Sequence, residues 1–456
     1  MNKKPLISDF RILEKIVEPK QELNMYHFKP IKGFSIDSRT IEEGCTYIAI
    51  KGKHHDGHKF IKQAITKGAV FVIAQKYIPT KRKVPFFIVD DSYKALGVVA
   101  NYIREKKKPF VYGITGSVGK TTTKDILSFL LSGHHKVLKN KKTENNLLGV
   151  AKTILALQDE KIVVLELGTN AKGEINTLSQ ISRPDIGIIT FIKPVHLEGL
   201  GSLKGIYKEK TSLFEVNSKI KAVLNRDDPY LAKVKNRNKV YWFGKKSSND
   251  LWARLVKRDS GGSIFLIQNK YKLTLPEQYE GFITNSLAAI LAARLLGIDL
   301  ADLIERMNSF NNWPPMRMQS QELNGFSIIN DAYNANPYSI ATALAGLKRS
   351  RLRKIAVLGD MLELGDKTIH YHRLLASSII KNGFDYCLTL GEYSWYLYDQ
   401  LKRGGYRKAH HFTSHKAIAQ FINKRAGGLK ARKRYLIFLK GSRKMELEKV
   451  IDYLKP

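Results

Sequence analysis

The sequence contains very little cysteine and has no long uninterrupted run of apolar residues. Its 456 residues include only two cysteines, Cys45 and Cys387, which lie far apart and match no metal-ligand spacing. A disulfide framework and a cysteine-based metal site are therefore excluded, and the chain is expected in a reducing compartment. No segment approaches the roughly 18 apolar residues that a membrane-spanning helix needs. The N-terminus lacks the apolar core of a signal peptide, so we predict a cytoplasmic protein that is not inserted in a membrane.

Acidic residues are scarce relative to basic ones: 41 Asp and Glu stand against 77 Lys and Arg, a net charge of +36. Such a charge attracts anions, and nucleic acid is the usual candidate. However, the basic residues are spread along the chain, and the densest runs, Lys81–Lys83 and Lys106–Lys108, are short. There is no zinc-finger spacing, RNA-recognition signature or long basic tail. We therefore do not expect nucleic acid to be the partner.

The length of the chain exceeds what one hydrophobic core supports, so two or three domains are expected. We predict three α/β domains: a small N-terminal domain over residues 1–107, a central domain with a mostly parallel sheet over 108–312, and a C-terminal Rossmann-like, doubly wound domain over 313–456. A charged linker at Lys106–Pro109 and a proline-containing segment at Asn311–Pro315 mark the boundaries. The last range alternates strand and helix, with predicted strands at Phe326–Ile329, Ile355–Leu358, Tyr386–Leu390 and Tyr435–Leu439.

The segment Val111–Thr123 is the most informative part of the chain. An apolar run, a glycine-containing turn and Gly-Lys-Thr at the start of an amphipathic stretch predict a strand, a phosphate-binding loop and a helix. Lys120 would reach the β- and γ-phosphates, and Thr121 would hold Mg²⁺. Ile114 replaces the glycine of the general P-loop pattern, which leaves the subtype Thr-Gly-x-x-Gly-Lys-Thr-Thr. We predict ATP or GTP binding by Thr115, Gly116, Ser117, Val118, Gly119, Lys120, Thr121 and Thr122.

Two further residues follow predicted parallel strands. Glu166 ends the apolar run Ile162–Leu165, and His196 comes shortly after Ile186–Thr190. Ligands of open α/β sheets bind at the carboxyl edge of the strands. Together with Thr121, these side chains predict a Mg²⁺ site beside the triphosphate.

Lys210, by contrast, is on local sequence alone a solvent-exposed lysine of a helix. Asn145, Asn146, Asn285, Arg317 and Asp331 are equally unremarkable one by one. Only their arrangement together indicates a functional role for them.

That arrangement is identified through motifs that extend over nearly the whole chain. They are Asp37–Arg39, Asp56–His58, Gly113–Lys124, Glu166–Gly168, Gly173–Ile175, His196–Gly199, Gly201–Leu203, Asp331–Pro337, Gly359–Gly365 and Lys440–Arg443. On these motifs the chain resembles the Mur ligase superfamily, and within it the branch that adds D-Ala-D-Ala to UDP-MurNAc-tripeptide. The P-loop subtype is shared by all Mur ligases and folylpolyglutamate synthetases, whereas the motifs of the last domain are more selective for this branch. The resemblance implies a monomeric, cytoplasmic bacterial enzyme of peptidoglycan precursor synthesis.

The resemblance also implies a mechanism. ATP phosphorylates the terminal carboxylate of the tripeptide, and the amine of D-Ala-D-Ala then attacks the acyl-phosphate to give the amide, ADP and phosphate. Such a reaction depends on positioning and charge neutralisation. By similarity, Thr121 and Glu166 hold one Mg²⁺ and His196 holds a second, while Lys210 matches a lysine that is carbamoylated in this superfamily. Lys120, His196 and Lys210 are thereby implied as the catalytic residues.

The remaining roles are also carried by similarity. Asn285 matches the residue that reads adenine, Arg317 the arginine that reaches the γ-phosphate, and Asp331 the aspartate on the ribose side. The implied substrate-binding residues are Ser38 and Arg39 at the uridine nucleotide, with Asn145, Asn146, Tyr333, Asn334 and Asn336.

Several positions depart from the usual residues of these motifs: Phe191 and Lys193 replace asparagine and glycine, Asn330 replaces an aspartate, Phe282-Ile283 fills a place where histidine is frequent, and Thr143 replaces an asparagine. Three alternatives therefore stay open. They are another amide ligase of the same superfamily, a basic P-loop protein that binds nucleic acid, and a noncatalytic relative that senses a nucleotide.

Overall fold

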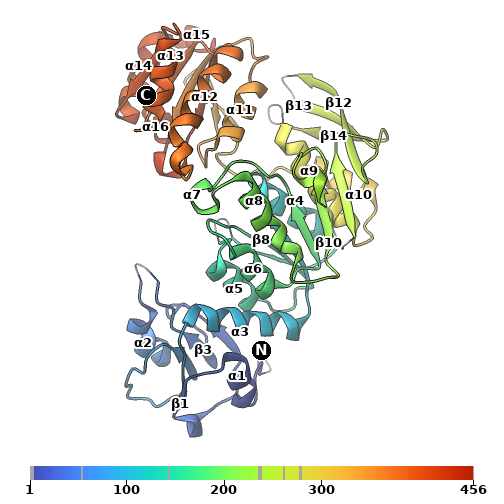
Figure 1. The fold of residues 1–456 in the computed structure, drawn as a ribbon, viewed down its shortest axis with the longest axis vertical. Helices are drawn as coiled ribbons and strands as arrows, with labels where there is room; N and C mark the ends of the chain where they lie inside the picture. The colour runs from blue at the N-terminus through green and yellow to red at the C-terminus, as the bar shows by residue number, and fades with distance from the viewer. Residues whose placement is uncertain are drawn as a thin grey trace.

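The computed structural model describes residues 5–52, 55–141, 144–234, 239–259, 262–276 and 280–454. They form three separate β-sheets with helices packed around them, which confirms the predicted α/β class (Figure 1). Figure 1 shows the three regions following one another along the long axis of the molecule, from the N-terminal to the C-terminal part of the chain. Each sheet falls within one of the three predicted ranges. We therefore keep the proposed division into a first, a central and a third domain.

The first sheet has five strands in the order β1-β5-β4-β3-β2. Only β1 pairs in antiparallel fashion, with β5. The strands are β1 (Gln21–Leu23), β2 (Gly33–Ser35), β3 (Cys45–Ile48), β4 (Phe71–Ala74) and β5 (Phe86–Ile88), and the helices are α1 (Phe10–Val17), α2 (Ile61–Thr66) and α3 (Ser92–Lys107). Both cysteines are buried as thiols, as their separation in the sequence predicts.

The prediction of a linker at Lys106–Pro109 is wrong for Lys106 and Lys107. These two lysines are the last residues of α3. The helix ends at Lys108, whose positive φ of 48° and N–H bond to Arg104 O close the last turn. Basic residues are favourable there because the C-terminal end of a helix carries partial negative charge. α3 packs against α5 (Leu147–Leu155) and α6 (Glu174–Ser182) of the central domain, and Asn101 Nδ2 donates to Gln180 O at 2.9 Å. The first domain is therefore joined to the central domain through a packed helix.

The central sheet has nine strands in the order β14-β13-β12-β11-β10-β9-β6-β8-β7. It is parallel from β7 to β12 and ends in an antiparallel ribbon of β12, β13 and β14, which confirms the predicted, mostly parallel sheet. Its strands are β6 (Phe110–Thr115), β7 (Val137–Lys139), β8 (Ile162–Glu166), β9 (Ile186–Ile189), β10 (Lys221–Asn225), β11 (Val240–Gly244), β12 (Leu251–Asp259), β13 (Gly262–Ile267) and β14 (Tyr271–Leu275).

The remaining helices of the central domain include the one that follows the P-loop. They are α4 (Lys120–Ser132), α7 (Leu197–Leu200), α8 (Leu203–Thr211), α9 (Glu280–Arg294) and α10 (Leu300–Asn308). The α4 and α9 helices pack side by side. Because α9 begins at Glu280, Phe282 and Ile283 lie inside this helix.

The third sheet has six strands in the order β15-β16-β20-β17-β18-β19, and all of them except β15 run parallel. The strands are β15 (Gln319–Leu323), β16 (Phe326–Asn330), β17 (Arg353–Gly359), β18 (Tyr386–Leu390), β19 (Ala409–Phe412) and β20 (Tyr435–Lys440). The helices are α11 (Pro337–Gly346), α12 (Thr368–Lys381), α13 (Ser394–Arg403), α14 (His415–Ala426), α15 (Leu429–Arg432) and α16 (Lys449–Leu454). The four predicted strands are therefore confirmed, and two edge strands are added to them.

None of the helices that the structure describes combines the length and the hydropathy required to cross a lipid bilayer.

Candidate active site

The P-loop connects the buried strand β6 to α4, as the sequence predicts. Gly116 and Gly119 adopt positive φ values of 145° and 86°. A Cβ atom at Gly116 would lie 2.0 Å from Thr190 Oγ1, and one at Gly119 would lie 2.2 Å from Asn285 Oδ1. Both conformation and space therefore require glycine at these two positions. Lys120 begins the helix and donates from Nζ to Gly116 O at 2.9 Å, and burial lowers the pKa of its ammonium group.

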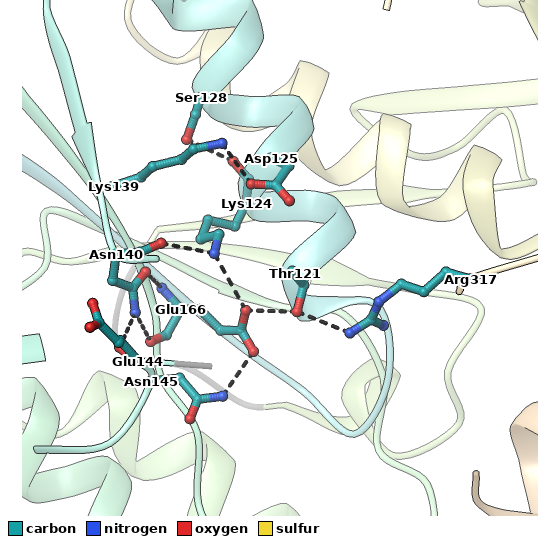
Figure 2. A network of polar contacts seen from close by, with 10 residues as sticks. All are labelled: Thr121, Lys124, Asp125, Ser128, Lys139, Asn140, Glu144, Asn145, Glu166 and Arg317. Atoms are coloured by element: carbon teal, nitrogen blue, oxygen red, sulfur yellow. Dashed lines mark hydrogen bonds and ion pairs between the residues drawn. The ribbon is translucent and has the colours of Figure 1, made fainter. Parts of the chain in front are cut away.

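Glu166, at the carboxyl end of β8, is held from several sides (Figure 2). Its Oε2 accepts a hydrogen bond from Thr121 Oγ1 at 2.8 Å, and its Oε1 accepts one from Asn145 Nδ2 at 2.9 Å. The Asn140 side chain bonds both the N–H and the C=O of Glu166, each at 2.9 Å. Buried Lys124 lies 3.9 Å from Oε2 and donates to Asn140 O at 2.9 Å. This network fixes the carboxylate beside the first turn of α4.

A cavity of about 570 Å³ opens over the P-loop and is lined by the central and third domains together. The predicted residues that line it are Ser117, Val118, Gly119, Lys120, Thr121, Thr122, Asn145, Asn146, Glu166, His196, Asn285, Arg317, Asp331, Tyr333, Asn334 and Asn336. The structure thus brings together residues that lie up to about 220 positions apart in the sequence, as expected when parallel strands gather their carboxyl ends at one edge.

The third domain reaches the P-loop through Arg317. Its Nη2 donates to Thr121 Oγ1 at 3.2 Å (Figure 2), and its guanidinium carbon lies 4.3 Å from the centre of the Tyr333 ring. Asp331 forms a buried ion pair with Lys440 Nζ at 2.5 Å and accepts from Met318 N at 3.1 Å. The Asp331–Lys440 pair therefore anchors the segment that carries Arg317.

His196 makes a second contact between these two domains. Its Nδ1 lies 2.6 Å from Glu363 Oε2, and this approach lowers the pKa of the Glu363 carboxyl group. Glu363 belongs to the Gly359–Gly365 motif of the third domain. His196 has the positive φ of 50° that precedes α7, so the turn directs its ring toward this neighbour.

The environment of Lys210 differs most clearly from the one that its local sequence predicts. The side chain is about 1% exposed, not on the surface of its helix as predicted, and it does not line the cavity. Burial, assisted by the charge of Lys120, moves the pKa of its ammonium group well below the ordinary value. The charge of the neighbouring Glu209 opposes this shift without reversing it, and its carboxylate accepts hydrogen bonds from Gly173 N at 2.7 Å and Ile175 N at 2.8 Å. Lys210 lies one turn after the buried Ile206 on α8, and tertiary packing covers this face of the helix although it carries a lysine.

Besides Lys210, four predicted residues lie outside this cavity. Ser38 and Arg39 belong to the first domain, where Ser38 Oγ donates to Gln63 Oε1 at 2.8 Å and the exposed Arg39 pairs with Asp37 at 2.7 Å. This pair holds the pKa of Asp37 at about 2. Thr115 and Gly116 belong to the P-loop but do not face the cavity. A uridine-nucleotide site at Ser38 and Arg39 would therefore be separate from the P-loop cavity.

Sequence reasoning missed several residues that support the site. Lys124, Glu363 and Lys440 stand inside motifs quoted above, so their positions carried a signal, but no role was assigned to them. Asn140 is fully buried and clamps Glu166, and it lies in no motif. Only the packing of β7 beside β8 reveals its function.

The unusual residues have different structural consequences. Asn330 Oδ1 accepts from Ala332 N at 3.1 Å, a turn contact that an aspartate makes equally well. Phe282 lines the cavity and packs against Trp313, with ring centres 4.5 Å apart. Thr143 lies outside the described residues. Phe191 and Lys193 contact the third domain.

The residues of the cavity fit a magnesium nucleotide. Thr121 and Glu166 supply hard oxygen donors 2.8 Å apart, and Mg²⁺ is usually held by one or two protein ligands together with phosphate and water. No group of three or more His, Cys, Asp or Glu residues with metal-binding geometry occurs in the described part of the chain. Asn285 Oδ1 is buried beside Gly119 without a hydrogen-bond partner among the described residues. A buried, unpaired amide oxygen at a phosphate loop suits a base amino group.

Comparison with known families gives three consecutive matches. They are the Mur ligase family catalytic domain over residues 30–116, the Mur ligase middle domain over 114–293 and the Mur ligase glutamate ligase domain over 316–443. Two similar curated proteins are named UDP-N-acetylmuramoyl-tripeptide–D-alanyl-D-alanine ligase. The protein from Buchnera aphidicola subsp. Baizongia pistaciae is 32% identical over 94% of this chain and 93% of its own length. The protein from Bacillus subtilis is 31% identical over 96% and 95%.

Solved structures agree with these matches. A crystal structure of MurF from Acinetobacter baumannii covers the whole of both chains with a TM-score of 0.87 at 26% identity. MurF ligase from Thermotoga maritima in complex with ADP covers 92% of this chain and 96% of its own, with a TM-score of 0.80 at 28% identity.

Proposed function

The chain belongs to the Mur ligase family, and we propose that it is the ATP-dependent ligase that joins D-Ala-D-Ala to UDP-MurNAc-tripeptide. The observation that carries this proposal is the cavity shared by two domains. The P-loop lines one side, the Asp331–Asn336 segment lines the other, and Arg317 bridges them at Thr121. ATP is the energy source, in agreement with the ADP complex of the Thermotoga maritima relative.

The first chemical step is phosphoryl transfer. A carboxylate oxygen of the tripeptide attacks the γ-phosphorus of ATP, and the bond to the bridging oxygen breaks to release ADP. Lys120 and Arg317 are positioned to stabilise the negative charge that is spread over the transferred group. Mg²⁺ held by Thr121 and Glu166 would neutralise further phosphate charge.

The second step is acyl transfer. The amine of D-Ala-D-Ala attacks the acyl carbon, the amine loses a proton, and phosphate leaves to form the amide. We assign Tyr333, Asn334 and Asn336 to the dipeptide side, since they line the wall of the cavity opposite the P-loop. Closure of the domains on the substrates would exclude water that would otherwise hydrolyse the acyl-phosphate.

We also propose a carbamoylated Lys210 that, with His196, holds a second Mg²⁺. A neutral amine is required to attack CO₂, and burial favours the neutral form of Lys210. Carbamoylation would convert a buried amine into an anionic oxygen donor. Ser38 and Arg39 remain our proposal for the uridine nucleotide, at the far end of a substrate that extends from the first domain. A reaction between ATP and a UDP-linked precursor is in keeping with the bacterial cytoplasm.

The test is phosphate release by purified protein with Mg-ATP. Release should require both UDP-MurNAc-tripeptide and D-Ala-D-Ala, and Lys120→Ala should abolish it. Lys219→Ala, which changes an exposed lysine of the same domain, is the matched control and should leave the rate unchanged. Turnover with glutamate or diaminopimelate in place of the dipeptide would refute the assignment to this branch.

A further inference from the structure

Two of the unusual residues, Phe191 and Lys193, lie on the loop between β9 and α7, which is bonded directly to the P-loop. Ser117 N donates to Phe191 O at 2.8 Å. Lys193 N donates to Ser117 Oγ, and Ser117 Oγ donates to Lys193 O, both at 2.8 Å. Any movement of this loop is therefore also a movement of the P-loop.

The side chains of both residues face Tyr338 of the third domain. Lys193 Nζ lies 4.7 Å from the centre of the Tyr338 ring and 5.6 Å from that of Phe191. The two rings are 5.8 Å apart and tilted by 45°. These distances are typical of cation–π and tilted aromatic contacts. Tyr338 is the second residue of α11, directly beside Asn336 on the wall of the cavity.

The ammonium group of Lys193 is held in place from the central domain. It lies 3.2 Å from Oδ2 of Asp228, which is fully buried. The Asp228 carboxylate also accepts from Ile192 N at 3.1 Å and Tyr230 N at 3.0 Å. A fixed carboxylate thus orients the cation toward Tyr338, and little side-chain entropy is left to lose when the third domain arrives.

We propose that Phe191, Lys193 and Tyr338 form an interdomain contact that stabilises the closed arrangement of the third domain over the P-loop. The proposal rests on the ligase function, because the described arrangement is the one in which Arg317 of the third domain contacts Thr121 of the P-loop. The three residues act by positioning and need not touch the reacting atoms. Where asparagine and glycine stand at positions 191 and 193, neither the aromatic ring nor the cation of this contact is present.

If this contact stabilises the closed arrangement, removing it should shift the open–closed equilibrium of the full chain toward the open form. Spin labels at Lys219→Cys and Lys416→Cys, two exposed positions of the central and third domains, report the distance between these domains. Cys45 and Cys387 are buried and stay in place. Tyr338→Leu removes the ring but keeps an apolar side chain, and we expect it to reduce the ratio of closed to open molecules by about tenfold. Tyr338→Phe retains the ring and should retain the closed population.

A double-mutant cycle separates the interdomain part from the pairing of Lys193 with Asp228. Lys193→Met and Tyr338→Leu should each open the chain, and the double variant should open it no further than the more open single variant. The apparent dissociation constant of ADP should rise by the same factor as the closed fraction falls, because a ligand that contacts both domains binds the closed form. Saturating kcat should change much less than KM.

An unchanged distance distribution in Tyr338→Leu, or strictly additive effects in the cycle, would overturn the proposal. Since the distance measurement requires no turnover, its result is independent of the ligase assay. A protein that fails the ligase assay but opens in Tyr338→Leu would refute the proposed function and leave the contact standing. Unchanged thermal unfolding of Tyr338→Leu, which leaves the pair of Lys193 with Asp228 intact, would show that the contact acts on domain position and not on folding.

Discussion

Lys124 and Lys210 are both buried lysines of the central domain, each about 1% exposed, yet their surroundings differ. Lys124 donates to Asn140 O at 2.9 Å and lies 3.9 Å from the carboxylate of Glu166 (Figure 2). Lys210 has no such contact with another described residue, and the nearby positive charge of Lys120 acts against its protonation. Burial lowers the pKa of both groups. The opposing carboxylate is Glu166 for Lys124, and for Lys210 it is Glu209, whose oxygens already accept hydrogen bonds from backbone N–H groups.

The difference separates two uses of a buried amine. A protonated lysine beside a carboxylate serves as a structural support, because each charge offsets the desolvation of the other. An amine without a partner is favoured in its neutral, nucleophilic form. The same residue type therefore holds Glu166 in place at one position, and we propose that it offers a reactive nitrogen at the other.

The largest expected effect concerns the reactivity of Lys210. Lys210→Met should lower the rate of phosphate release at saturating substrates by about 100-fold or more, because the proposed anionic group can no longer form. Lys210→Arg keeps the positive charge and should be equally impaired. Lys210→Glu restores a carboxylate and should recover part of the rate.

Carbon dioxide gives an independent control for Lys210. The wild-type rate should fall in buffer depleted of CO₂ and return with bicarbonate, and ¹³CO₂ should give a carbamate signal that Lys210→Arg lacks. Full activity of Lys210→Arg would contradict the assignment.

The second effect concerns the structural role of Lys124. Lys124→Met should lower the local stability of α4 and β8 by about 3 kcal/mol, because it leaves the buried Glu166 carboxylate without its counter-charge. Lys210→Met should not lower the stability of α8 at neutral pH. Hydrogen exchange of peptides from these elements is the appropriate measurement, since a chain of three domains need not unfold in one step. Equal losses in the two variants would remove the distinction between the lysines.

The third effect is the pH dependence of the difference in stability between the wild type and Lys210→Met, measured without CO₂. The folded pKa of Lys210 lies below its ordinary value of 10.5, so between these two values the unfolded chain binds a proton that the folded chain lacks. Raising the pH removes that proton from the unfolded state and stabilises the folded one, by at most about 1.4 kcal/mol per pH unit. The free energy of unfolding of the wild type should therefore increase relative to that of Lys210→Met as the pH rises from 7 toward 10. A difference that stays constant would show that Lys210 is protonated in the fold.

The smallest effect is expected at an exposed lysine of the same network. Lys139 Nζ pairs with Asp125 Oδ1 at 2.7 Å, but its side chain is 40% exposed (Figure 2). Lys139→Met should change the stability of α4 by about 0.5 kcal/mol or less, because water screens such pairs. A loss as large as that of Lys124→Met would show that burial is not what distinguishes these lysines.

Much of the fold and of the nucleotide site could be predicted, because local patterns carry them. The P-loop follows from glycines at positive φ between a buried strand and a helix, and β8 and β9 follow from apolar, β-branched runs. Glu166 could be placed because it ends such a run. The linker at Lys106–Pro109 was mispredicted, since the charges that suggest a linker also suit the C-terminal end of α3.

The sequence by itself determined the order of strands and helices, the phosphate loop and the family motifs, since each depends on residues close together in the chain. Only the tertiary structure decided that Lys210 is buried, that Asn140 clamps Glu166, and that Lys193 faces Tyr338. These relations join elements that are distant in sequence, and burial and electrostatic environment depend on which elements pack together. The chemistry of an amine in this protein is therefore decided by its neighbours in space. The sequence alone does not distinguish a lysine that supports a carboxylate from one that we propose reacts with CO₂.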